Sequence, residues 1–196
     1  MVVILYQLAK NPDKLAIAME ELEKLGFTDL DNKDAYHPDN ISRLTYITYV
    51  IKESLRIDGP TVESLHYKAY EDVEIAGVPF KKGTVFIKDL SVPHYDPEEY
   101  IDPLKYIPER FDPESKYFLK PTDGKARRPY SYVPFSFGCR ACPGQTFAML
   151  ELKVALAYIL THVKYEIDPE YLSNETLGFA VGSTFDCPMT IKDIKY

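Results

Sequence analysis

Two cysteines separated by two residues lie in the stretch FSFGCRACPG, residues 135–144. A thiolate can bind a metal ion, exchange with a disulfide or attack an electrophile, so Cys139 and Cys142 are the residues whose types most directly allow chemistry. A Cys-x-x-Cys pair occurs in structural zinc sites and in thioredoxin-like redox proteins. The residues around the pair must decide between these uses.

Zinc binding and dithiol redox chemistry are alternatives that the rest of the chain supports poorly. A structural zinc site has four ligands, and this sequence provides a single Cys-x-x-Cys pair. The third cysteine, Cys187, and the four histidines are scattered singly along the chain. A thioredoxin-like pair follows a strand of a βαβ unit, whereas this pair follows a proline-rich stretch. Both interpretations therefore lack their partner residues.

A wider pattern surrounds the second cysteine, and it reads Phe-x-x-Gly-x-Arg-x-Cys-x-Gly. Its fixed positions are Phe135, Gly138, Arg140, Cys142 and Gly144. With ordinary residue usage, five fixed identities coincide by chance at on the order of one in a million per start position. The pattern resembles the signature loop of the cytochrome P450 family, whose members hold heme b through a cysteine thiolate. The resemblance implies an iron site at this loop.

The resemblance implies that Cys142 is the only cysteine that ligates the iron. Its thiolate would push electron density onto the metal and favour cleavage of the O–O bond. The start of the helix expected at 145–164 could supply the positive potential that a thiolate needs. Phe135 would pack over the sulfur and limit water there. Cys139 occupies a variable position of the pattern, so it receives no role.

Four further residues receive heme-binding roles from the same resemblance. Gly138 would adopt a turn conformation that other residues avoid. Gly144 would let the backbone lie against the porphyrin, and Arg140 would contact a propionate through a charge-assisted bond. His66 is the best candidate for a second propionate contact, although it could equally be an ordinary surface histidine. Glu63, close by in an otherwise apolar stretch, has no explanation at this level.

Three charged residues resemble a second feature of the family. Glu53 and Arg56 in KESLR are three residues apart and share one face of a helix. Arg110 lies in YIPERF, between that helix and the cysteine loop. In the family these groups form a buried hydrogen-bonded network behind the heme, and such a network could hold the long irregular stretch between them. The alternative is three unrelated surface charges.

The fold class expected is mainly α with small β-sheets (α+β), the C-terminal portion of the cytochrome P450 fold from helix J onward. One partial domain, residues 1–196, would contain helices ending in Glu-x-x-Arg (1–57), a β-rich segment with a hairpin at 72–88 (58–88), an irregular segment with PERF (89–134), the heme-thiolate loop (135–144), a helix (145–164) and C-terminal strands (165–196) around LGFAV and MTIKDI.

Three local signals refine the helices expected in the first 57 residues. Asn11-Pro12 predicts a break between two helical pieces, and Gly26 predicts a C-cap. A strongly amphipathic helix is expected over 40–57, with Asn40 or Ser42 as its N-cap. Its apolar side comprises Ile41, Leu44, Ile47, Ile51 and Leu55.

Composition excludes several classes of protein. The 196 residues carry a net charge of −7, so no nucleic-acid partner is expected. Three cysteines cannot make a disulfide framework. The first apolar run is far shorter than the ~20 residues of a membrane span and lacks the basic leader of a signal peptide.

The resemblance implies a heme-thiolate monooxygenase that inserts one oxygen atom from O₂ into a lipophilic small molecule, with electrons from an NADPH-dependent reductase. The family's oxygen-activating helix would lie before Met1, so the catalytic residues are unknown. The alternative is a truncated, catalytically incompetent fragment whose partner would be a missing N-terminal half. A form with an N-terminal anchor would belong to the endoplasmic reticulum membrane, but this chain contains no anchor.

Overall fold

The computed structural model describes residues 1–173 and 188–194 and has both helices and small antiparallel sheets. The helices are α1 (Val2–Lys10), α2 (Pro12–Lys24), α3 (Pro38–Ser42), α4 (Thr45–Asp58), α5 (Gln145–His162) and α6 (Pro169–Ser173). The strands are β1 (Tyr67–Lys68), β2 (Val73–Ile75), β3 (Val78–Phe80), β4 (Val85–Phe86), β5 (Val163–Ile167) and β6 (Met189–Ile194). Short 3₁₀ turns are η1 (Val92–Tyr95), η2 (Pro108–Phe111) and η3 (Gly138–Arg140). This is the α+β class expected from the sequence.

The first two helices are separated at the Asn11-Pro12 pair. Helix α1 ends at Lys10, and Pro12 opens α2 at a position where its missing N–H leaves no bond unmade. Gly26 has φ +78°, a conformation that favours glycine, and the next N–H, that of Phe27, reaches back to the Leu22 carbonyl at 2.9 Å. Gly26 therefore ends α2 in the way its position predicted.

Helix α4 begins later than expected, and a different residue caps it. The structure places Asn40 and Ser42 in the separate helix α3, so the prediction that one of them caps a 40–57 helix is wrong. Instead the carboxylate of Glu21, on α2, accepts the N–H groups of residues 45–47 at 2.8, 2.7 and 2.9 Å. A charged group from another helix therefore fixes the start of α4.

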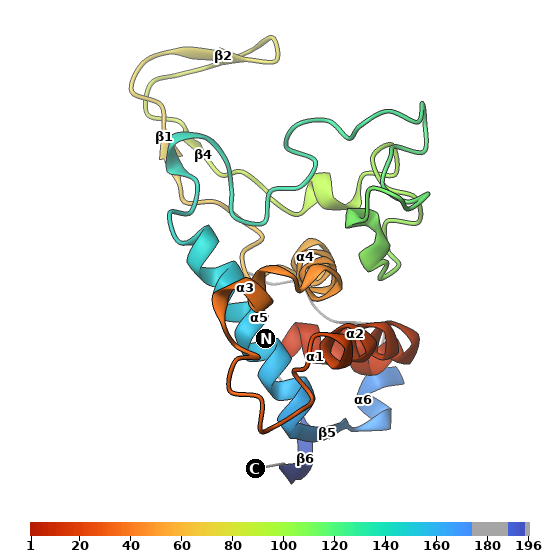
Figure 1. The fold of residues 1–196 in the computed structure, drawn as a ribbon. Coiled ribbons are helices and arrows are strands. Elements are labelled where there is room, and N and C mark those ends of the chain that lie inside the picture. The colour runs from red at the N-terminus through yellow and green to blue at the C-terminus, as the bar shows by residue number, and fades with distance from the viewer. Residues whose placement is uncertain (174–187, 195–196) are drawn as a thin grey trace.

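Helix α4 is the central element of the molecule. It contacts α1, α2 and α5, and it also contacts η1 and η2 of the irregular segment. In Figure 1, α1 and α2 lie on one side of α4, and the segment around residues 89–134 lies on the other. The five apolar residues predicted for one side, Ile41 to Leu55, are all buried in a core with residues of α1, α2 and α5. Burial of this stripe places the opposite face of α4 against the irregular segment.

The small strands do not form the single hairpin that residues 72–88 predicted. Strands β2 and β3 do pair through a tight turn in which Ala76 and Gly77 have positive φ angles of 50° and 79°, as a two-residue hairpin requires. Strand β4, however, pairs with β1, through Tyr67 opposite Phe86. The hairpin is therefore an excursion between two strands that lie close to the cysteine loop (Figure 1).

The C-terminal part has one long helix and one sheet. Helix α5 spans 18 residues and stops at His162, two residues earlier than expected, because Val163 opens β5. Strand β5 pairs with β6, which contains the MTIKDI stretch. The LGFAV stretch that was also expected to form a strand lies outside the described residues.

Candidate functional site

The loop that carries the two cysteines is closed by backbone bonds. The N–H of Cys142 donates to the Phe135 carbonyl at 2.9 Å, and the N–H of Ala141 donates to the Gly138 carbonyl at 3.1 Å. Gly138 has φ +77°, and a Cβ added there would meet no atom within 4 Å. Its glycine is therefore required by backbone conformation rather than by space.

The two thiols of this loop are free, and both are exposed. Cys142 lies three residues before Gln145, where α5 begins with no side-chain cap in the described part of the chain. A Cβ added at Gly144 would lie 3.8 Å from the Cys142 sulfur, an ordinary van der Waals distance, so Gly144 lies directly beside the thiol. Nucleophilic or metal-binding chemistry is thus available at Cys142.

Cys142 opens onto a cavity of about 640 Å³. The cavity extends from Leu55, residues 60–61 and residues 63–67 across Leu90 to residues 134–136 and 140–143, and its lining is mostly apolar. Its size is typical of a site for a small molecule or cofactor. Phe135 lines the cavity and also packs against the hydrophobic core, which anchors one end of the loop.

Polar side chains in the cavity wall fit the chemistry of a heme. Arg140 and His66 both line the cavity and are exposed, so each could hold a propionate. The thiol of Cys142 could ligate an iron, and the apolar wall would suit a porphyrin face. Glu63 also lines this cavity, and the structure gives no reason for its carboxylate there. Apart from Glu63, the residues present match an apolar disc with one thiolate ligand and an anionic edge.

Behind the cavity the structure brings Glu53, Arg56 and Arg110 together. Arg56 donates from Nε and Nη2 to the two Glu53 oxygens, both at 2.8 Å, as a bidentate pair. Arg110 Nε donates to Glu53 Oε1 at 3.1 Å. All three side chains are 0% exposed. Such buried charges are tolerated only when each finds partners, because water cannot reach them.

The remaining donors of the two arginines bind the irregular segment. Arg110 Nη2 donates to the carbonyls of Asp102 at 2.6 Å and Lys105 at 3.2 Å, and the N–H of Ile107 donates to Glu53 Oε1 at 2.9 Å. Burial lowers the pKa of the Arg110 guanidinium, and its carboxylate partner opposes that shift. These bonds hold a stretch with little regular structure against α4, in place of packed secondary structure.

One buried residue of this region was missed by sequence reasoning. His94 is 4% exposed, its carbonyl accepts from Arg56 Nη1 at 2.7 Å, and its Nε2 accepts from the Val133 N–H at 2.8 Å. The only available signal was a histidine beside an irregular, proline-rich stretch, which is too weak to assign a role. His94 therefore links the ion-pair network to the chain that leads into the cysteine loop.

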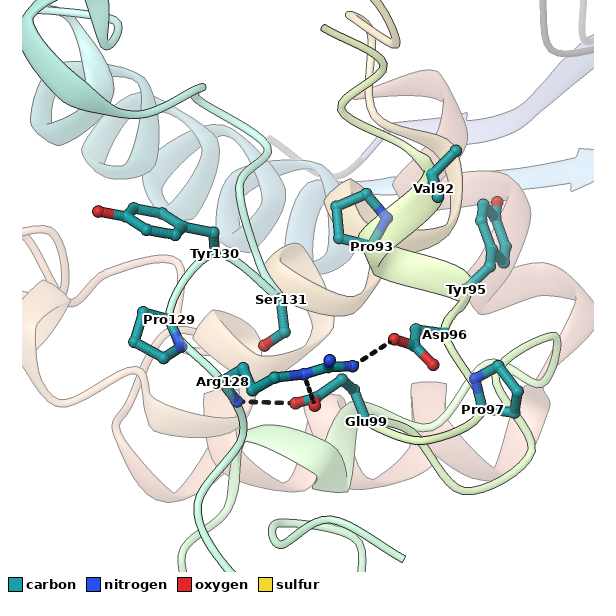
Figure 2. A pocket seen from close by; sticks show the side chains of 10 residues that line it. All are labelled: Val92, Pro93, Tyr95, Asp96, Pro97, Glu99, Arg128, Pro129, Tyr130 and Ser131. Carbon is teal, nitrogen blue, oxygen red and sulfur yellow. Dashed lines mark hydrogen bonds and ion pairs between the residues drawn. The ribbon is translucent and has the colours of Figure 1, made fainter. Parts of the chain in front are cut away.

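A second cavity, of about 610 Å³, lies on the other side of that chain and is shown in Figure 2. Arg128 lies between two carboxylates there, with Nη2 2.7 Å from Asp96 and Nε 2.5 Å from Glu99. The Arg128 N–H also donates to Glu99, at 2.8 Å. The charged side chains that line this cavity, Asp96, Glu99 and Arg128, are thus engaged with one another.

Within 1–173 and 188–194, no group of three or more His, Cys, Asp or Glu side chains is arranged to hold a metal ion. Cys187 lies outside these residues. No helix in this part of the chain is both long enough and apolar enough to cross a membrane.

Comparisons with known proteins agree with the loop and its setting. The family model described as "Cytochrome P450" matches residues 1–182. The chain is 35% identical over 162 residues to cytochrome P450 4F12 of Homo sapiens, covering 83% of this chain and 29% of that protein. It is 36% identical over 179 residues to cytochrome P450 4V2 of Rattus norvegicus, covering 90% of this chain and 31% of the relative. The chain thus spans less than a third of the length of these relatives.

Proposed function

The chain belongs to the cytochrome P450 family, and from this premise we propose that it forms the thiolate-bearing part of the heme site of a monooxygenase. The observation that carries the proposal is the exposed Cys142 at the edge of an apolar cavity, within the family's loop pattern. Heme b is the cofactor of this family, and the cavity residues fit it. Cys142 is the proposed iron ligand, and Cys139 has no part in ligation.

The residues around Cys142 have distinct proposed tasks. Arg140 and His66, which both line the cavity, would contact the two propionates of a bound heme. Gly138 allows the tight turn of the loop through its positive φ, and Gly144, which has no side chain beside the sulfur, would leave room for the backbone to lie against a porphyrin. Phe135 closes the loop against the core and limits water at the sulfur.

The network of Glu53, Arg56 and Arg110 acts at a distance from the cofactor. It fixes the segment from which the cysteine loop departs, and so it keeps the thiol in register with the cavity. We expect its loss to weaken heme binding through misplacement of the loop, since none of its groups lines the cavity.

When bound, a heme with a thiolate ligand supplies the electron push that splits O₂ and allows one oxygen atom to enter an organic substrate. The apolar cavity wall favours a lipophilic substrate, and the electrons would come from an NADPH-dependent reductase. The alternative is a truncated, catalytically incompetent P450 fragment, and the outcome that separates the two is product formation with added reductase and NADPH. The residues of this chain provide the ligand and its setting in both cases.

The ligand assignment is tested with the purified chain and added hemin. After reduction, the CO difference spectrum should show a thiolate-type Soret band. Cys142→Ala should abolish that band, because it removes the ligand, while the matched control Cys139→Ser should keep it. Loss of the band in Cys139→Ser alone, or its persistence in Cys142→Ala, would refute Cys142 as the ligand.

A further inference from the structure

The stretch from Arg128 to Gly144 contains only the short turn η3, so its position depends on individual anchors. There are four before the cysteine loop: Arg128 binds Glu99, the Ser131 carbonyl accepts from Tyr100 at 3.0 Å, Tyr132 donates to the Lys52 carbonyl at 3.1 Å, and the Val133 N–H donates to His94. The last of these is the nearest to Cys142 along the chain. It is also the only one in which a side chain holds a backbone N–H in a fully buried setting.

His94 is held from both sides. Its main chain is fixed by Arg56, a member of the buried network, at 2.7 Å, and its ring binds the Val133 N–H at 2.8 Å. Because Nε2 accepts this bond, the neutral ring must carry its proton on Nδ1. A ring packed in this way, 4% exposed and beside the Tyr132 ring, has little freedom to reorient.

Two further backbone bonds continue from Val133 to the thiol. The N–H of Ser136 donates to the Val133 carbonyl at 2.9 Å, and this turn sets the direction of Phe135. The Phe135 carbonyl then accepts from the Cys142 N–H at 2.9 Å. A shift of Val133 is therefore transmitted to the backbone of Cys142 through two bonds and a tight turn.

We propose that His94 is a positioning residue for Cys142, acting through its bond to Val133 and anchored by Arg56. The consequence for a heme rests on the proposed function, whereas the positioning of the thiol does not. His94 itself does not line the cavity, so it has no direct contact with a ligand there.

The test uses the full chain without heme, so its outcome is separate from that of the ligand test. Cys139→Ser and Cys187→Ser leave Cys142 as the single thiol. In this background His94 is changed to Gln, Asn or Leu. The Gln amide oxygen reaches the place of Nε2, the shorter Asn reaches only the place of Nδ1, and Leu has no acceptor. Two quantities are measured. One is the hydrogen-exchange rate of the Val133 and Cys142 amides, and the other is the rate at which the Cys142 thiol reacts with a disulfide reagent.

We expect His94→Gln to behave like the parent chain. His94→Asn and His94→Leu should speed exchange at Val133 by roughly ten- to a hundredfold, because a buried N–H loses its acceptor. Both variants should also speed amide exchange at Cys142, and they should change the rate at which its thiol reacts with the disulfide reagent by about threefold or more. The same result with His94→Gln as with His94→Leu would overturn the role of the acceptor.

Unchanged Cys142 exchange and thiol rate, with Val133 alone affected, would overturn the positioning of Cys142. If His94→Leu fails to fold, amides of the α4 core lose protection together with Val133, and the Gln and Asn variants then decide. The Gln and Asn side chains have the same polar group and differ only in length. A difference between these two variants in Cys142 exchange and thiol reaction rate therefore supports the proposal, and identical behaviour contradicts it.

Discussion

Two groups of ion pairs hold the same irregular segment, one on each side, and they differ in burial. Glu53, Arg56 and Arg110 are wholly buried, and almost every donor of the two arginines is bound to a carboxylate or a carbonyl. Arg128 makes contacts as short with Asp96 and Glu99 (Figure 2). Its side chain is 56% exposed, however, although that of Glu99 is only 2% exposed. Contact distance alone does not distinguish the two groups.

From this difference we expect burial, rather than contact distance, to set how much each group contributes to the free energy of unfolding. An exposed guanidinium exchanges its partner for water at little cost, and salt screens what remains. A buried one has no such exchange, so the loss of one partner leaves an uncompensated charge. Tyr100 marks the boundary between the two groups, because its ring lies 5.0 Å from the Arg56 guanidinium and its hydroxyl reaches Ser131 on the chain after Arg128.

A substitution at Glu53 tests the difference between the two groups most directly. Glu53→Gln keeps the shape but leaves two buried arginines without a counter-charge, and we expect a loss of about 3–5 kcal/mol in the free energy of unfolding. Urea unfolding followed by circular dichroism measures it. The control is Glu74→Gln, which changes an exposed glutamate on β2 and should leave stability nearly unchanged. A loss no larger than that of the control would show that burial is not the deciding factor.

Acid should lower the stability of the folded chain through His94, which lies beside the buried group. Burial, and next the charge of Arg56, lower its pKa from 6.5 to about 4, while Asp89 opposes the shift. As pH falls below 6.5 the unfolded chain takes up a proton that the folded ring does not. Stability is therefore full above pH 6.5 and declines until pH 4, by about 3 kcal/mol.

This decline is measured as the difference between the parent chain and His94→Gln across that pH window, so that carboxylates common to both cancel. The parent should lose stability relative to the variant as pH falls. Parallel curves would mean that His94 is not held neutral in the folded chain, and that the buried side is no more sensitive to acid than the exposed side.

The smallest effect is expected at Arg128. Arg128→Ala should cost roughly a third of the Glu53→Gln loss or less, because the lost guanidinium is exposed and the buried Glu99 carboxylate keeps its bond from the backbone N–H of residue 128. About 1 M NaCl should shrink the Arg128→Ala effect and leave the Glu53→Gln effect nearly intact. Thermal unfolding at low and high salt measures both. Equal salt sensitivity of the two variants would remove the distinction between the two groups.

Features that depend on neighbours in the chain could be predicted from the sequence. The five-residue pattern around Cys142, the break at Asn11-Pro12, and the apolar stripe of α4 follow from identity, backbone restriction and helical period. Glu53 and Arg56 share a helix face because they are three residues apart. The resemblance added Arg110 to this pair, and the structure brings all three together.

Features that depend on pairing between distant segments were decided only by the tertiary structure. Glu21 caps α4 from another helix, β4 pairs with β1 instead of closing the hairpin, and His94 binds Val133 across 39 positions. No local pattern marks these residues, because a carboxylate, a short strand or an imidazole can bind many partners. Packing of α4 between the core and the irregular segment selects which partner lies within bonding distance, and buried polar groups must then accept the partner they meet.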